Sequence, residues 1–590
     1  MNANNRRTTA KKTTLKKAPP AKPSVGKTIW NLVITILFAG LYFYIVLPAI
    51  NFQDPMFYVF VIVVFLFNCI MNLLTNGALM TFLDAMTTQD DGSPPVPGEA
   101  SRVLMASIKA YCQVPALIII IIAAVVALGY TISVPVFRAR QYRDLLRVEQ
   151  STFTMDVDEI SFDQIPRVDD DSARRLGSRS VGELADVVSQ YEIAQDFTQI
   201  NYLGRPVRVT PLVYGDPIKW FMNRRTGIPG YILIDMVSQN TEVIRIPEVI
   251  EGETGIRYSN SEHFARRLNR HLRFSYPSYM FDHPNFEIDE DGVPYWVCPR
   301  LVKRIGLFGG RDIDGAVLMN AVTGESSFFL PDEIPSWVDR VYTSDLIVQQ
   351  YDFYGKYQNG FFNSVIGQRD VTETTEGYNY IAFDDDVYMY TGITSAVTDD
   401  SIIGFILTNQ RTKDTRFYAV AGATELSAAD SAKGQVQHLN YDATFPILLN
   451  ISDHPTYFMS LKDNAGLVKL YGMVNVNQFQ IVATAETVAE VTVAYLDLMV
   501  TAGLSDVKEA LLSEDDVFVS GAITDIRSAV ISGNTRIYVR LQGSSAYFSI
   551  ASAHIENAVL LNVGDVVQLR GPESDEDIRQ GYRIVTSASR

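Results

Sequence analysis

The chain has 590 residues, of which 47% are hydrophobic and 20% are charged. This is too long for one compact core, since domains usually hold roughly 100–200 residues, and too apolar for a mainly disordered chain. The formal charge is −17, yet residues 1–27 carry eight Lys or Arg and no acid, which leaves 42 basic and 67 acidic side chains elsewhere. An acidic body argues against a general nucleic-acid binder. Three cysteines exclude a disulfide-stapled scaffold and a Cys-rich zinc module.

Three long uncharged segments near the N-terminus predict helices that span a membrane. They cover residues 29–50, 56–74 and 116–136. At 1.5 Å per residue the first reaches about 33 Å, and a hydrocarbon core is about 30 Å thick. A cleaved signal peptide fits less well, because its apolar core has about 7–15 residues. We expect a transmembrane helical hairpin over 29–75, a cytoplasmic loop over 76–114 and a third transmembrane helix over 115–137.

The basic N-terminus sets the predicted orientation. Residues 1–28 should form a disordered tail, and their positive charge favours a cytoplasmic N-terminus. Three crossings then place residues 138–590 outside the cell. Four arginines after the third span favour the opposite orientation (Arg138, Arg140, Arg143 and Arg147), but the tail carries more positive charges. Cys298, alone in the soluble part, suits a bacterial plasma membrane better than the endoplasmic reticulum.

The predicted fold class is an α+β membrane protein. Its soluble part should comprise a juxtamembrane helical region over 138–200, a repeated α+β domain over 201–480, a connecting helix over 481–514 and a small OB-like β-barrel over 515–590. In the juxtamembrane region we expect helices over 138–149, from Asp171 onward, and over 181–195.

A strand-turn-strand pattern recurs four times in the α+β domain. The four hairpins begin at Gly230, Gly315, Gly404 and Thr456, and β-rich runs precede them at Val209, Val293, Val387 and Phe445. Three strands in each of four units predict an internal repeat of about 50–90 residues. Helices expected over 261–274, 424–437 and 484–512 make this an α+β layer arrangement. The alternative is one irregular antiparallel sheet with ordinary hairpins.

One of these turns carries a family resemblance. The segment Asn320-Ala-Val-Thr-Gly-Glu325 resembles the hairpin of PepSY-type modules, which are small α+β domains of extracytoplasmic bacterial proteins. That family usually has Asp where this chain has Asn320, and the other three hairpins lack Thr-Gly-Glu. The resemblance implies a non-catalytic interaction or inhibitory module.

The C-terminal region resembles an OB-fold. Strands are expected from Val517, Thr535, Ala546, Gly564 and Tyr582, with a short helical piece over 551–559. Five strands that close on themselves remove the sheet edges. Such folds bind single-stranded nucleic acid through aromatics beside basic residues, here Tyr538, Tyr547, Phe548, Arg527, Arg536 and Arg540. The acidic segment 573–578 and the predicted location favour a packing role for these aromatics.

No sequence motif predicts catalysis, a cofactor or a metal site. The acidic segment 287–292 begins like an EF-hand loop, but Cys298 occupies the position that needs a bidentate Glu, so we expect a turn. Asp384–Asp386 and Asp399–Asp400 should be solvated loop charges rather than calcium ligands. The six histidines are scattered (His263, His271, His283, His438, His454 and His554), and His283 and His454 precede prolines in turns. Gly306–Gly310 lacks the Gly-Lys-Ser/Thr ending of a phosphate loop.

The sequence also contains an aromatic-rich stretch between residues 351 and 362. Residues 351–357, together with Phe361 and Phe362, contain six aromatic side chains whose spacing does not match a strand or a helix. Core packing explains most aromatics, and a contact loop is the second hypothesis, because Tyr and Phe are favoured in interface cores.

These observations predict a membrane-anchored extracytoplasmic scaffold or interaction protein, a subunit of a cell-envelope assembly without catalysis. Its partners would be the lipid bilayer and either further copies of itself or envelope proteins, because sheet edges recruit other strands. The alternatives are a regulator or inhibitor of an envelope enzyme or peptidase through PepSY-like modules, an enzyme that uses scattered carboxylates, and a nucleic-acid-binding module if the C-terminal part is cytoplasmic.

The predicted orientation can be tested with a C-terminal tag. Protease added to intact cells should remove the tag, because three crossings place the C-terminus outside. Protection of the tag until the cells are lysed would contradict this topology.

Overall fold

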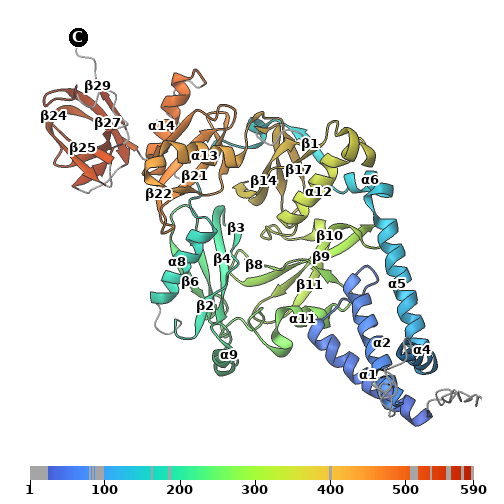
Figure 1. The fold of residues 1–590 in the computed structure, drawn as a ribbon. Coiled ribbons are helices and arrows are strands. Elements are labelled where there is room, and N and C mark those ends of the chain that lie inside the picture. Colours follow the sequence, from blue (N-terminus) through green and yellow to red (C-terminus); the bar gives the residue numbers. More distant parts are fainter. Residues whose placement is uncertain are drawn as a thin grey trace, which may run out of the picture. The chain divides into compact units, whose positions relative to one another are not determined.

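The computed structural model describes residues 24–78, 82, 86, 99–160, 164–183, 188–383, 385–396, 401–504, 516–531, 534–552, 560–572, 577–581 and 583–586. The protein is α+β, with three long apolar helices near the N-terminus and several β-sheets (Figure 1). Two compact units divide the chain. The first contains residues up to 133 together with 272–280 and 306–309, and the second contains 134–271, 281–305 and 310 onward.

The first unit is built on the three apolar helices. They are α1 (Val25–Val46), α2 (Pro55–Thr75) and α5 (Gln113–Ser133), each long and apolar enough to cross a membrane, and α4 (Glu99–Tyr111) precedes α5. Side-chain hydrogen bonds join α1 to α2: Asn31 donates to Asn72 at 2.7 Å, and Asn68 donates to Thr35 at 3.0 Å. Polar bonds of this kind hold helices together where lipid offers no competing partner.

Two later segments pack on the ends of these helices. Arg273 donates from Nε to the carbonyl oxygen of Leu47 at 3.0 Å, and the Ile50 amide donates to Pro277 at 2.8 Å. The hydroxyl of Ser133 accepts hydrogen bonds from the amides of Leu307 and Phe308, both at 3.1 Å. The end of α1, the turn before α2 and the end of α5 are therefore all hydrogen-bonded to the segments 272–280 and 306–309.

Four sheets with one strand order dominate the second unit. The first contains β2 (Tyr191–Ile193), β3 (Thr198–Tyr202), β4 (Arg205–Tyr214), β5 (Gly230–Asp235) and β6 (Thr241–Arg245); the second contains β7 (Met280–Phe281), β8 (Asn285–Ile288), β9 (Pro294–Ile305), β10 (Gly309–Asn320) and β11 (Ser326–Phe329). The third contains β12 (Thr372–Thr374), β13 (Asn379–Phe383), β14 (Asp386–Ser395), β16 (Gly404–Asn409) and β17 (Thr415–Tyr418); the fourth contains β19 (Asp442–Ala443), β20 (Ile447–Ile451), β21 (His454–Lys462), β22 (Val468–Asn475) and β23 (Val482–Ala485). In each sheet the third strand lies between the first and the fourth, the fifth follows the fourth, and the second pairs with the third.

A helix precedes each sheet in the chain. These helices are α8 (Asp170–Glu183), α11 (Leu268–Ser275), α12 (Ser344–Lys356) and α13 (Glu425–Gln435). The last hairpin of each sheet begins with an Asx residue whose side-chain oxygen accepts backbone hydrogen bonds in the turn: Asp235, Asn320, Asn409 and Asn475. The amide of the residue after each Asx donates to the third strand of the same sheet, as Ala321 does to Pro294 at 2.9 Å. The same local device thus ends the fourth strand four times.

The predicted hairpins match three of the four sheets. Gly230, Gly315 and Gly404 stand at the same place in β5, β10 and β16, where an added Cβ would meet the carbonyl oxygen of the facing strand at 2.0–2.3 Å. The hairpin predicted from Thr456 is instead β21 with β22, one strand too early in the fourth sheet. Its true counterpart, β22 with β23, has Leu470 at the position of these glycines, and β23 is only Val482–Ala485, so the pattern passes over it. The first, second and fourth sheets have five strands and the third has six, because β1 (Val148–Ser151) joins it; three strands per unit were predicted.

Three further expectations differ from the structure. The helix predicted over 138–149 ends at Arg143 (α6, Pro135–Arg143), and β1 (Val148–Ser151) pairs in parallel with β17. The region 181–195 ends in the strand β2, because buried Tyr191 and Ile193 alternate with exposed Glu192. The aromatic stretch 351–357 lies mainly in α12, where Ile347 and Tyr351 are buried at helical spacing. The contact-loop hypothesis for that stretch is therefore wrong.

The C-terminal part forms one more sheet. It contains β24 (Asp516–Ile531), β25 (Asn534–Leu541), β26 (Tyr547–Ala551), β27 (Val566–Pro572), β28 (Ile578–Gln580) and β29 (Arg583–Thr586), in the order β28-β26-β25-β24-β27-β29. The connecting helix is shorter than predicted over the described residues, α14 (Val488–Thr501), and Gly503 follows it with φ 70°. The helical piece expected over 551–559 lies mostly outside the described residues.

Replacing Asn320 with alanine should lower the free energy of unfolding by about 1–2 kcal/mol, because two turn amides, one part-buried and one exposed, lose their acceptor. The Oδ1 atom of Asn320 accepts from Val322 and Thr323, each at 2.9 Å. Pulse proteolysis in mild detergent measures the change. Asn320→Asp keeps the acceptor and is the control; an equal loss in both variants would contradict the turn explanation.

Candidate functional site

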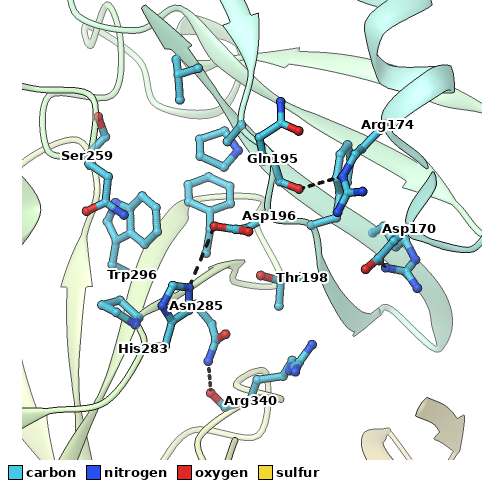
Figure 2. A pocket seen from close by; sticks show the side chains of 18 of the residues that line it. Asp170, Arg174, Gln195, Asp196, Thr198, Ser259, His283, Asn285, Trp296 and Arg340 are labelled. Atoms are coloured by element: carbon cyan, nitrogen blue, oxygen red, sulfur yellow. Dashed lines mark hydrogen bonds and ion pairs between the residues drawn. The ribbon is translucent and has the colours of Figure 1, made fainter. Parts of the chain in front are cut away.

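A cavity of about 300 Å³ opens where residues of the first three sheets meet, in the second unit. Figure 2 shows its walls. The β2–β3 connection supplies Gln195 and Asp196, the segment before β8 supplies His283, β9 supplies Trp296 and β13 supplies Tyr380. The fold brings these groups together from chain segments almost 190 residues apart. The site therefore depends on the packing of the sheets and not on any local motif.

Arginines give the cavity its electrostatic character. Arg208, on β4, has a side chain that is 7% exposed; it donates to the carbonyl oxygen of Val168 at 3.1 Å and pairs with Asp170. Burial lowers the pKa of Arg208, and the charges of Asp170 and Asp169 oppose that shift. Arg174, on α8, donates to the carbonyl oxygen of Gln195 at 3.1 Å. A buried charge needs such partners, since an unpaired one is costly.

Arg340 joins the cavity to the third sheet. Its guanidinium lies 4.3 Å from the ring centroid of Tyr380 and donates to the Tyr380 hydroxyl at 2.6 Å. Its backbone carbonyl accepts from Asn285 at 3.0 Å, a bond visible in Figure 2. The Nε atom of Arg340 is buried without a hydrogen-bond partner.

The rim and floor are aromatic and partly polar. Phe197, Phe286, Trp296 and Tyr380 contribute rings, and the indole of Trp296 donates to the carbonyl oxygen of Tyr258 at 2.8 Å. At the exposed rim, His283 lies 4.0 Å from Asp196. Arginine and aromatic side chains in the wall of one cavity suit recognition of an anionic group on an apolar body.

Two buried carboxyl groups lie behind Arg340. Glu287, on β8, accepts from the amides of Asp339 and Arg340 at 2.8 and 3.0 Å, and Asp339 accepts from the Asn201 amide at 2.6 Å. Burial raises the pKa of Glu287 to about 7, despite the backbone hydrogen bonds it accepts. Burial, followed by the charge of Glu287, raises the pKa of Asp339. Because the Arg340 amide donates to Glu287, protonation of Glu287 would alter a hydrogen bond that holds the backbone at Arg340.

The acidic segments take different roles from those predicted. The turn expected at 287–292 is present: Asp289 accepts from the amides of Asp291 and Val293, and Gly292 has φ 80°. Asp386 was expected to be a solvated loop charge and is instead buried, in a pair with Arg411 at 2.7 Å. Asp384, Asp399 and Asp400 lie outside the described residues. Among the residues that the structure describes, no three His, Cys, Asp or Glu side chains gather as metal ligands.

The remaining candidates are dispersed. His454 hydrogen-bonds the Leu504 carbonyl oxygen at 2.9 Å, at the start of β21. Cys298 is fully buried in β9, and burial raises the pKa of its thiol. In the C-terminal sheet, Phe548 is buried, whereas Tyr547 carries Arg527 and Arg540 near its ring at 5.2 and 5.1 Å. Arg536 is buried and pairs with Glu490 at 3.1 Å, so it is not available to a nucleic acid.

Comparisons of the chain with protein-family models, curated proteins and solved structures found no match. The site therefore rests on its geometry alone. Sequence reasoning missed Arg208, Arg340 and Asp339. The available signal was a charged residue inside an apolar run, as in Val207-Arg208-Val209, which indicates a buried pair but not its partner.

Replacing Glu287 with glutamine should change how stability depends on pH. Glu287 has a pKa of 4.5 when unfolded and about 7 when folded, so the unfolded state releases its proton first as pH rises. The wild-type protein should lose stability between these two values, and Glu287→Gln should lose less. Unfolding midpoints measured near pH 5 and pH 8 give the difference. Glu290→Gln removes an exposed carboxylate of the turn after β8 and should leave the pH dependence unchanged. Equal pH dependence of the two variants would contradict the assignment to Glu287.

Proposed function

We propose that this protein is a membrane-anchored extracytoplasmic scaffold that holds a partner protein of the cell envelope. Three helices long and apolar enough to span a membrane supply the anchor. The observation that carries the proposal is the cavity lined by Arg174, Arg208 and Arg340 beside four aromatic rings. Arginine and aromatic residues dominate the energetics of protein interfaces. The partner segment would carry a carboxylate next to an apolar side chain.

The four sheets support a repeat origin for the soluble part. We infer that they are copies of one unit, because strand order and the Asx turn recur in each. The PepSY-like interpretation extends to the same turns: Asn320 occupies the position where that family has Asp, and Asp235 lies at the corresponding turn of the first sheet. A regulatory role toward an envelope enzyme or peptidase is the second candidate, since it would use the same surface.

The C-terminal sheet supports an OB-like barrel. Strand β24 pairs with both β25 and β27, β26 pairs in parallel with β28, and β29 pairs with β27. The segment β28–β29 thus links β26 to β27, as the last strand of a closed barrel does. In the proposed orientation this barrel lies outside the cell, and we assign it to protein contacts.

Crosslinking in cells tests the proposed function. A photoreactive amino acid at Asn260, an exposed residue of the cavity lining, should form an adduct with another protein, whereas one at exposed Glu251 should not. Arg174→Glu reverses a lining charge and should reduce the adduct by about fivefold or more. Arg179→Glu, on the exposed side of the same helix, is the control.

Two results would count against the scaffold. Equal adduct yields from Asn260 and Glu251 would mean that the cavity is not the contact. A monomer without any copurifying protein after mild detergent extraction would contradict a stable assembly.

A further inference from the structure

A second surface of the soluble unit exposes large apolar side chains. Ile218, Phe221 and Met222 of α9 (Pro217–Asn223) are 72%, 59% and 73% exposed, and Phe264 of the short helical turn Phe264–Arg266 is 66% exposed. These four side chains define the α9 surface. Contiguous exposed apolar groups of this size usually mark an interaction site.

Hydrogen bonds hold the α9 surface in shape. Trp220 packs against His263 and Phe264, with ring centroids 4.5 and 5.9 Å apart, and donates to Glu262 at 2.7 Å. Glu262 is buried and also accepts from the Tyr214 hydroxyl at 2.8 Å. The apolar side chains therefore project from two segments that these contacts hold together, the helix α9 and the short turn before α11.

Positive charge surrounds this apolar surface, although the soluble part as a whole is acidic. Arg224 lies 4.0 Å from the ring centroid of Phe221, and Arg225 and Arg267 are exposed beside the two segments. The nearby carboxylates are engaged, since Glu262 binds Trp220 and Asp216 caps α9 through the amides of Ile218 and Lys219. Apolar side chains ringed by arginine are the composition of helices that lie in the surface of an anionic bilayer.

The chain continues from this surface into the membrane unit. Helix α11 begins at Leu268, four residues after Phe264, and reaches Phe274 within about 9 Å of helical rise. Phe274 contacts Phe43 and Tyr44, in the last turn of the spanning helix α1, with ring centroids 6.0 and 6.3 Å apart. Chain continuity with a helix long and apolar enough to span a membrane, together with the surrounding arginines, favours the lipid surface as the occupant.

We infer that the α9 surface is a second membrane contact: its apolar side chains enter the bilayer interface, and Arg225 and Arg267 bind anionic phospholipid headgroups. This contact is independent of the partner proposed for the cavity.

Lipid-attached quenchers test this inference on the full chain in vesicles. Met222→Cys and Ile366→Cys, each labelled with an environment-sensitive fluorophore, place probes at two highly exposed apolar positions, the second on the turn after α12. The labelled wild-type chain gives the background from its own cysteines. Vesicles contain phosphatidylcholine with about 30% phosphatidylglycerol and a shallow spin-labelled lipid.

The probe at residue 222 should be quenched at least about twofold more than the probe at residue 366, because only the former would sit among lipids. Arg225→Gln combined with Arg267→Gln should reduce this quenching when phosphatidylglycerol is present and leave it unchanged in phosphatidylcholine alone. Equal quenching at the two positions would overturn the inference. Crosslinking of residue 222 to a second copy, without quenching, would overturn it in favour of self-association.

Discussion

Each of the four sheets depends on one constraint: the backbone amides at its last hairpin must find acceptors where the chain turns inside the protein. A single Asx side chain meets this requirement at 235, 320, 409 and 475, and the following amide is then free to bond to the third strand. Buried amides without partners are costly. The device thus fixes both the turn and the register of the strands beside it, independently of the side chains that fill each core.

Paired charges link the sheets to one another. Lys413, in the last hairpin of the third sheet, binds Asp312 of β10 at 2.6 Å, and Lys462 of the fourth sheet binds Asp169, just before α8, at 2.6 Å. Half-buried pairs add little net stability but penalise any arrangement that separates them. Apolar packing alone would tolerate several ways of stacking similar sheets, so these pairs select one. The cavity forms at such a junction, which explains why its arginines already have partners.

Sequence patterns predicted the features that local physics determines. The three long apolar helices follow from uninterrupted apolar length, and the hairpins at Gly230, Gly315 and Gly404 follow from glycines that a facing carbonyl requires. The fourth hairpin lacked that glycine and was placed one strand early. The aromatic residues of α12 hid its helical period because both faces of the helix are apolar. The cavity could not be predicted, since Arg208 and Tyr380 are 172 residues apart and only packing joins them.

The backbone passes between the two units five times, since 272–280 and 306–309 belong with the helices. The unit that contains the apolar helices is thus assembled from three separate segments of the chain. Within this unit, Gly129 of α5 leaves room for the ring of Phe308, because a Cβ added at Gly129 would lie 2.6 Å from that ring. Cutting the chain at residue 134 would separate the segments 272–280 and 306–309 from the apolar helices, and Phe274 and Phe308 would lose the side chains against which they pack.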